Sequence, residues 1–186
     1  MSRRTRSGDG RRAPKRAAYT IVETAIGPLL VAAHGGRLVA IKFGVDERRA
    51  PEALEELGRE LRGAFALERD DRALAPAARH LRAYLDGRRA DLDIPFDLSW
   101  VTGFRRDVLL EVARVPRGAV VSYGEIARRV GRPAAYRAVG NTMRTNPIPL
   151  VIPCHRIVGS DGSLTGFGGG LAMKRKLLAL EGAALP

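Results

Sequence analysis

The sequence predicts an α/β N-terminal domain followed by a mainly α-helical C-terminal domain that contains a helix-turn-helix. Short β-rich runs and two long helical patterns occupy the first half of the chain, whereas short helical patterns separated by proline and glycine fill the second. The charge changes with them, since residues 17–99 carry a net charge of −2 and residues 100–186 a net charge of +8. The 186 residues suffice for two domains, which we expect at 18–98 and 99–186.

The first strands follow a short basic segment. Residues 1–17 contain Gly, Ser and Pro and almost nothing apolar, and the first 16 of them have a net charge of +6, so we expect a disordered basic tail over 1–17. Short β-rich runs then fill Tyr19–Phe43, separated by turn residues at 26–28 and 34–36. This pattern predicts a small antiparallel meander.

Two helices are predicted after the meander. Apolar residues recur at helical spacing from Pro51 to Leu67, and a proline suits the first turn of a helix. A second helical pattern covers Leu74–Leu85, with Gly87 near its C-terminal end. Residues 91–100 contain Pro95 and are expected to connect the two domains.

A helix-turn-helix is predicted in the C-terminal domain. A first helix begins near Thr102 and ends at the Pro-Arg-Gly of residues 116–118. Ser122 and Glu125 then fit a capping box, in which the serine hydroxyl accepts from the Glu125 N–H and the carboxylate accepts from the Ser122 N–H. The helix that follows reaches Val130. After a turn at 131–133 another helix covers 134–144, and two short helices joined by a tight glycine turn indicate a helix-turn-helix.

The remaining residues are expected to form an extended segment, a turn, a loop and a helix. Leu150–Val158 is apolar and predicted to be extended. Residues 160–163 read Ser-Asp-Gly-Ser, which is typical of a turn, and the glycine-rich residues 166–170 are expected to form a flexible loop. Leu171–Glu181 is a closing helix with leucines for packing.

The composition excludes several classes of site. The single cysteine, Cys154, cannot form an internal disulfide or supply a cysteine-rich zinc site, and the three histidines are scattered. We therefore expect no metal and no cofactor. No run reaches the roughly 20 apolar residues of a membrane span, and no apolar signal stretch follows the N-terminus, so we expect a cytoplasmic protein without a membrane partner. The positive C-terminal half indicates either a polyanionic partner or an arginine-rich solubilising surface.

Cys154 lies between an apolar run and two basic residues, His155 and Arg156. The thiolate is the reactive form of cysteine, and cationic or hydrogen-bonding neighbours increase its population. His155 is a candidate base, acting directly or through a water molecule. Glu181 would orient His155 if the closing helix folds back onto it, and would otherwise be an ordinary surface carboxylate.

Four motifs in one order resemble the O6-alkylguanine-DNA alkyltransferase family. They are Arg137–Gly140, Asn146–Pro149, the Pro-Cys-His-Arg of residues 153–156, and the glycine loop with the final helix; the resemblance covers roughly 104–182. Residues 26–30 also resemble that family's N-terminal domain. The resemblance implies a ribonuclease-H-like N-terminal domain, no N-terminal zinc module, and double-stranded DNA containing O6-alkylguanine as the partner. It further implies a monomer that can cluster on DNA.

The resemblance also implies the reaction and the residues that perform it. The damaged nucleotide would be flipped out of the duplex, and its alkyl group would move irreversibly to Cys154 in a single turnover, with O4-alkylthymine left open as a second substrate. His155, a water molecule and Glu181 would generate the thiolate, Asn146 would couple the DNA-reading helix to the active-site segment, and Tyr123 would donate to the guanine. The expected DNA-binding residues are Tyr123, Gly124, Arg132, Arg137, Ala138, Arg144 and Ser160, and the expected base pocket contains Met143, Ile157, Phe167 and Gly168.

Three other functions fit the sequence less well. A non-catalytic binder of alkylated DNA would lack the acceptor cysteine, and an alkylation-sensing regulator would need further cysteines for zinc. A cysteine hydrolase would need an oxyanion hole, for which the pattern gives no reason.

Phe167 stands where relatives of the family often have tyrosine, Gly168–Gly170 is unusually bare, and Asn141 replaces a commoner small residue. These departures concern the shape of the pocket and the alkyl preference.

Overall fold

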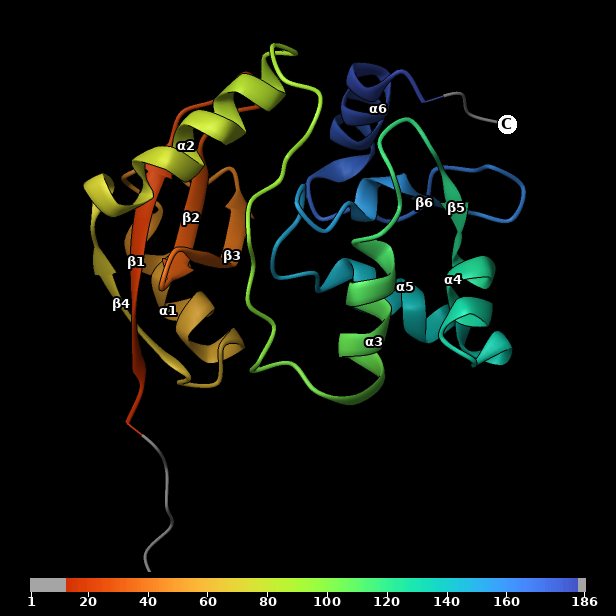
Figure 1. Cartoon of the computed structure of the whole chain (residues 1–186), viewed down its shortest axis with the longest axis horizontal. Helices are drawn as coiled ribbons and strands as arrows, with labels where there is room; N and C mark the ends of the chain where they lie inside the picture. The colour runs from red at the N-terminus through yellow and green to blue at the C-terminus, as the bar shows by residue number, and fades with distance from the viewer. Residues whose placement is uncertain (1–12, 184–186) are drawn as a thin grey trace, which may run out of the picture.

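A computed structural model describes residues 13–183 and contains two sheets with helices packed around them (Figure 1). The N-terminal elements are β1 (Lys15–Val22), β2 (Leu29–His34), β3 (Arg37–Phe43), α1 (Ala50–Glu60), β4 (Phe65–Arg69) and α2 (Asp71–Leu85). The C-terminal elements are α3 (Gly103–Val112), β5 (Val121–Ser122), α4 (Tyr123–Arg129), the 3-10 turn η1 (Pro133–Ala135), α5 (Tyr136–Arg144), the 3-10 turn η2 (Cys154–Arg156), β6 (Ile157–Val158) and α6 (Gly170–Glu181).

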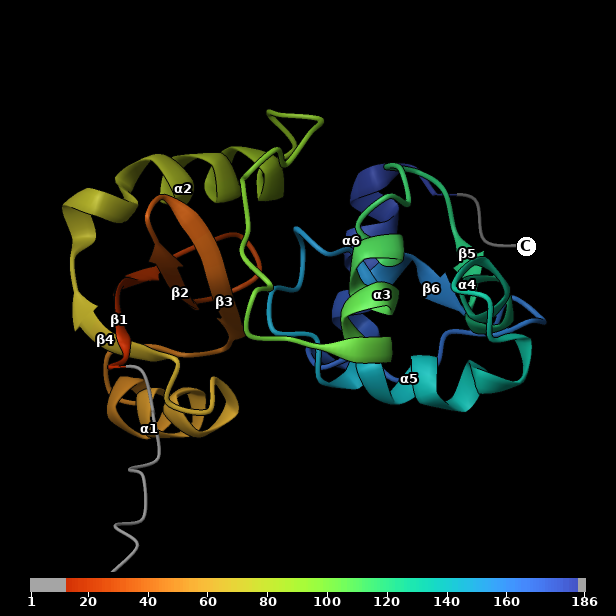
Figure 2. The same cartoon turned by 60° about the horizontal axis from the view of Figure 1, so that its bottom comes forward.

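The N-terminal sheet has the strand order β3-β2-β1-β4. The predicted meander is confirmed, because β1, β2 and β3 pair antiparallel in sequence order. Strand β4 pairs parallel with β1, with α1 as the crossover between β3 and β4. Figure 2 shows α1 and α2 on opposite sides of this sheet. Residues of β2 alternate between the two faces, since Leu30 packs with the α1 side and Leu29 with the α2 side.

Two expectations for this domain were wrong. The first predicted helix ends at Glu60 rather than Leu67, because Arg62 and Gly63 adopt positive φ values of 53° and 69° and turn the chain into β4. Phe65, which matched the helical spacing, is instead a buried residue of that strand. The predicted tail extends too far, because β1 begins at Lys15 and pairs there with Phe65. Residues 1–12 of the expected tail lie outside the described range.

The predicted helix-turn-helix is formed by α4, η1 and α5. The Ser122 hydroxyl accepts from the Glu125 N–H at 3.1 Å, which is one half of the expected capping box. The other half is wrong, because the Glu125 carboxylate accepts from Arg128 at 2.7 Å and from Arg129 at 3.0 Å. Hydrogen bonds between ionised groups are stronger than a bond to a backbone N–H, so the two arginines hold the carboxylate.

The segment 150–158 is not extended as predicted. Leu150 has a φ of 76°, and Cys154–Arg156 forms the 3-10 turn η2. Only Ile157 and Val158 are a strand, which pairs parallel with β5. The apolar composition that indicated a strand reflects burial instead, because residues 152–158 are all buried. The turn places the single cysteine at a bend in the chain.

The two domains meet along β3. The Ile41 N–H donates to the Pro147 carbonyl at 2.8 Å, so the strand is tied to the segment before Cys154. Leu38 exchanges backbone hydrogen bonds with the connector, donating to Pro95 and accepting from Asp97, both at 2.8 Å. One cluster of buried apolar side chains includes residues of both domains. Within residues 13–183, no helix is both long enough and apolar enough to cross a bilayer.

Candidate functional site

Cys154 lies at a cavity of about 200 Å³ between β3 and the C-terminal domain. Of the expected base-pocket residues, Met143, Phe167 and Gly168 line it. Ile157 does not, because it is fully buried and its carbonyl accepts from the Lys174 ammonium at 2.5 Å. No local pattern indicated that the N-terminal domain would contribute one wall of the cavity, through Ile41, Lys42 and Phe43. The lining consists of Ile41, Lys42, Phe43, Met143, Arg144, Asn146, Pro149, Cys154, Phe167 and Gly168.

The Cys154 side chain is almost completely buried, with 4% of its surface exposed. Burial raises the pKa of the thiol to about 11, because a thiolate loses the solvation that water would provide. A hydrogen bond with Asn146 and the charge of Lys174 both act to lower that pKa and do not fully compensate. At neutral pH the resting side chain is therefore a thiol, and any reaction as a nucleophile requires a base.

Asn146 holds the turn that leads to Cys154. Its side-chain oxygen accepts from the Ile148 N–H at 3.0 Å, and its amide nitrogen donates to the Ile152 carbonyl at 2.8 Å. These two bonds bracket Leu150, whose positive φ is a strained conformation for a branched side chain. Asn146 lies two residues after the last residue of α5, so its side chain connects the end of that helix to the segment before Cys154.

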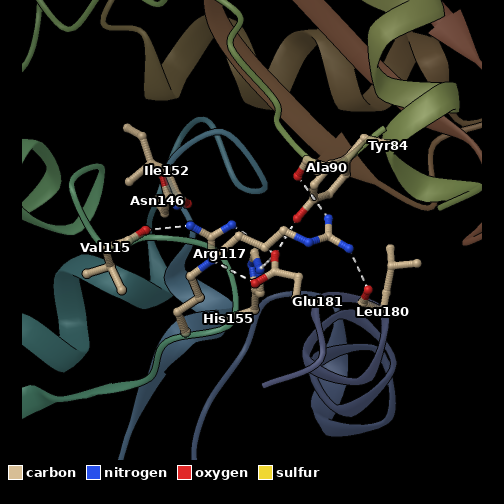
Figure 3. Close-up of polar contacts among 10 residues, drawn as sticks. Tyr84, Ala90, Val115, Arg117, Asn146, Ile152, His155, Leu180 and Glu181 are labelled. Carbon is tan, nitrogen blue, oxygen red and sulfur yellow. Dashed lines mark hydrogen bonds and ion pairs between the residues drawn. The ribbon is translucent and has the colours of Figure 1, made fainter. Parts of the chain in front are cut away.

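His155 contacts Glu181 from the closing helix (Figure 3). His155 Nε2 lies 2.7 Å from Glu181 Oε1, and both side chains are inaccessible to solvent. Helix α6 thus folds back onto the cysteine segment, and Gly182, with a φ of 69°, ends the helix directly after the carboxylate. The other ring nitrogen, Nδ1, is buried without a hydrogen-bond partner among the described residues.

The Glu181 carboxylate is surrounded by donors besides His155. Arg156 Nε donates to Oε2 at 2.8 Å, and Tyr84 of α2 donates its hydroxyl to Oε1. Arg156 also donates to the Val115 carbonyl at 2.5 Å. Burial alone would raise the pKa of Glu181, but the hydrogen bonds from His155, Arg156 and Tyr84 outweigh it and hold that pKa far below its usual value. The carboxylate is therefore ionised throughout the neutral range.

Burial acts in the opposite sense on His155. It lowers the pKa of the imidazole, and the neighbouring Glu181 carboxylate opposes this without cancelling it. A neutral imidazole at pH 7 can accept a proton, which a protonated one cannot. The site therefore contains a buried thiol, a neutral base and an ionised carboxylate that holds one nitrogen of the base.

Two residues near the site were not anticipated. Tyr84 lies 97 positions before Glu181 in the chain and in the other domain, so local patterns could not connect them. Lys174 is fully buried and donates to the carbonyls of Ile157 at 2.5 Å and Thr165 at 2.9 Å. Burial lowers the pKa of this lysine to about 8. Lys174 belongs to the last motif of the resemblance, which was the one signal pointing to it.

All but one of the expected DNA-binding residues lie between the start of α4 and the end of α5, and the remaining one, Ser160, follows β6. Tyr123 begins α4, is half-buried, and its hydroxyl lies 3.4 Å from the Thr165 carbonyl. A hollow of about 270 Å³ between α5 and residues 165–166 contains Tyr123 and shares Arg144 with the cysteine cavity. Most of the other expected residues are solvent-exposed, namely Arg132, Arg137, Ala138, Arg144 and Ser160, whereas Gly124 is partly buried.

Family comparisons cover nearly all of the described residues. The ribonuclease-like domain of 6-O-methylguanine DNA methyltransferase matches residues 17–98, and the DNA-binding domain of the same family matches residues 103–183. The predicted fold class is thereby confirmed: a ribonuclease-like domain with a mixed sheet precedes a mainly helical DNA-binding domain.

Curated and solved relatives agree with this match. The methylated-DNA–protein-cysteine methyltransferase of Mycobacterium tuberculosis is 37% identical over 168 residues, covering 90% of this chain and 94% of that protein. The protein of the same name from Methanosarcina barkeri is 36% identical, covering 88% and 96%. Among solved structures, the O6-methylguanine methyltransferase of M. tuberculosis superposes with a TM-score of 0.73 at 36% identity, covering 89% and 93% of the two chains. A structure of M. tuberculosis OGT in complex with DNA gives a TM-score of 0.70 at 32% identity, covering 90% and 92%.

Proposed function

The chain belongs to the 6-O-methylguanine DNA methyltransferase family, and we propose that it repairs DNA by transferring the alkyl group from O6 of guanine to its own Cys154. The observation that carries this proposal is the placement of the single cysteine at a cavity and next to the His155–Glu181 pair. A non-catalytic lesion binder is not favoured, because an acceptor cysteine is present and the relatives are named as methyltransferases.

The thiol proton leaves first in the proposed reaction. His155 Nδ1 accepts it through a water molecule, while Glu181 holds Nε2 and stabilises the imidazolium that forms. The thiolate sulfur then attacks the alkyl carbon, a C–S bond forms, and the bond between that carbon and guanine O6 breaks. The guanine leaves with the electron pair and takes up a proton, for which the Tyr123 hydroxyl is the proposed donor.

A guanine stacked within a duplex cannot present its O6 substituent to a buried sulfur, so the nucleotide must first be extruded. We assign this step to α5. The exposed Arg137 would occupy the gap left in the base stack, since a planar guanidinium can both stack and donate hydrogen bonds. The extruded base would enter the cavity between Met143 and Phe167. Exposed cations such as Arg132 and Arg144 would contact phosphates, which fixes the position on DNA without reading sequence.

The product explains why each molecule should react once. A thioether is a poor leaving group, and the chain has no second cysteine to displace it. We expect a cytoplasmic monomer that acts on double-stranded DNA and can cluster on it. The alkyl range, including any activity on O4-alkylthymine, depends on the space beside Phe167 and Gly168.

Titration with excess O6-methylguanine DNA tests the proposal. The wild-type protein should reach a plateau of one alkyl group per molecule, with the added mass on the peptide that contains Cys154. Cys154→Ser should lose transfer and still bind DNA, because the sulfur acts as nucleophile and not as a DNA contact. Continued turnover, or label on any other residue, would refute the proposed function.

A further inference from the structure

A second groove lies where α1 meets the C-terminal domain, with a volume of about 420 Å³. Its charged lining is almost entirely positive, and Glu60 is the one carboxylate residue in it. The five cations come from four separate segments of the chain, so the charge does not follow from one basic stretch. They are Lys42 of β3, Arg59 of α1, Arg62 after α1, Arg105 of α3 and Arg144 at the end of α5.

This cationic groove adjoins the cysteine cavity. Lys42, Arg144 and Asn146 line both hollows, so a molecule that fills the cavity would reach the edge of the groove. Arg144 also lines the hollow beside Tyr123 on α5. In Figure 2, α1 and α5 both lie along the lower side of the molecule. The three hollows therefore border one another across a surface that both domains share.

Salt bridges within the protein neutralise only part of the charge. Lys42 pairs with Glu60 at 2.5 Å, and Arg59 lies 4.0 Å from a carboxylate oxygen of Glu55. Arg62, Arg105 and Arg144 have no carboxylate partner within residues 13–183. Three unneutralised guanidinium groups around one hollow repel one another, which costs stability unless an anion binds between them.

Arg105 gives an independent indication of an anion. It is partly buried, one terminal nitrogen donates to the Thr145 carbonyl at 2.5 Å, and its guanidinium lies 5.8 Å from the Trp100 ring. Its Nε is buried and makes no hydrogen bond within the described part of the chain. Burial lowers the pKa of Arg105, and the opposing charge of Glu60 does not compensate for the lost solvation. A fixed, incompletely satisfied guanidinium is a suitable partner for a phosphate.

We propose that this cationic groove binds the sugar–phosphate backbone of DNA next to the nucleotide that occupies the cysteine cavity. The proposal rests on the proposed function, since it takes the DNA to be the substrate duplex. It makes the N-terminal domain a direct DNA contact, through Arg59 and Arg62, in addition to the helix-turn-helix. A sugar–phosphate backbone carries a negative charge at every nucleotide, so it can bring phosphates to cations from both domains.

The salt dependence of DNA binding tests the groove. Arg59→Gln/Arg62→Gln removes two charges at the exposed end of α1, away from the buried site. The matched control is Arg72→Gln/Arg79→Gln, which removes two exposed charges from α2 on the opposite face of the sheet. Each lost phosphate contact should reduce the slope of log K against log salt by about 0.9, so we expect a decrease of roughly 1 to 2 for the groove variant and much less for the control. Equal slopes for the two double variants would refute the proposal.

Duplexes with a single neutral methylphosphonate near the lesion locate the contact. One or two flanking positions should weaken binding by the wild type and have little effect on the Arg59→Gln/Arg62→Gln variant, because the partner charge is already gone. If every methylphosphonate weakened binding equally in the wild type and in the Arg59→Gln/Arg62→Gln variant, the groove assignment would be wrong. Reaction with the free base O6-benzylguanine separates the groove hypothesis from the proposed alkyl transfer. Both double variants should react with this free base as the wild type does, because the reaction needs no contact with the DNA backbone. Failure of the wild type to transfer the methyl group from O6-methylguanine DNA to Cys154 would instead overturn the proposed function.

Discussion

Replacing His155 by glutamine should change the pH dependence of alkyl transfer. Glutamine can still donate a hydrogen bond to Glu181, but it cannot accept the thiol proton at the position of Nδ1. With His155 present, the reactive state is a thiol beside a neutral imidazole. The rate should therefore be nearly constant from about pH 7 until the thiol itself ionises near its pKa of about 11, and fall at acidic pH as the imidazole is protonated.

The structure sets the size of the effect. With a pKa of about 11, roughly one Cys154 in 3,000 is a thiolate at pH 7.5 without help from a base. His155→Gln should then slow transfer by about 10²- to 10³-fold at pH 7.5, within the range found for general bases. Because hydroxide must replace the base, the rate of the variant should rise about tenfold per pH unit between pH 7 and 10. The difference from the wild type should shrink accordingly.

Single-turnover transfer from O6-benzylguanine, followed from pH 6 to 10, measures this without DNA binding. The control is His80→Gln, which changes a histidine of α2 that has no hydrogen bond to the site. Thermal unfolding of each variant shows whether the fold is kept. Parallel pH profiles for wild type and His155→Gln would show that the imidazole does not take the proton, and the proposed relay would then be wrong.

Three further predictions follow from the same structure. Glu181→Gln leaves the buried Arg156 without a counter-charge and should reduce the free energy of unfolding at pH 7 by about 3–5 kcal/mol, measured by denaturant titration. The folded-state pKa of Glu181 lies below its unfolded value of about 4.3, so the stabilisation by the ionised carboxylate is complete above that pH and is lost as the pH falls further. The difference in unfolding free energy between wild type and variant should therefore narrow below about pH 4. A difference that is independent of pH would exclude the ion pair as its cause. Arg137→Ala should slow repair of duplex DNA far more than reaction with the free base, because only the duplex requires extrusion, and equal losses would place the role of Arg137 elsewhere. Deleting residues 1–12, which carry a net charge of +4, should weaken DNA binding and reduce its salt dependence. The single-turnover rate at saturating DNA should stay unchanged, and a large loss of that rate would make these residues part of the active site.

The elements that the sequence predicted well are those whose own pattern decides their structure. The meander has turn residues between β-rich runs, and α6 has apolar spacing and a glycine at its end. Strand β4 was missed because Leu61 and Phe65 are four residues apart, which fits a helix equally well. The decisive feature is parallel pairing with β1, and a contact between residues fifty positions apart leaves no local pattern.

The candidate site divides in the same way. Cys154, His155 and Glu181 could be singled out from residue type and motif order, and the structure places His155 against Glu181. Their surroundings could not be predicted. Tyr84 reaches Glu181 from the other domain, and the carbonyl of Ile157 is taken by Lys174 rather than facing the cavity. The first contact depends on how the two domains pack, and the second on how α6 folds back onto β6 within the C-terminal domain; residue spacing encodes neither.

The hydrogen bonds along β3 have a consequence for any attempt to divide this protein. β3 is an edge strand of its sheet, and the groups that would otherwise be free, at Leu38 and Ile41, are taken by the connector and by Pro147. An N-terminal fragment that ends before the connector would leave this row of donors and acceptors bare, which is a template for pairing with another copy. Such a fragment should therefore self-associate at concentrations at which the whole chain stays dispersed. The C-terminal domain thus protects the N-terminal sheet from aggregation, in addition to carrying the cysteine.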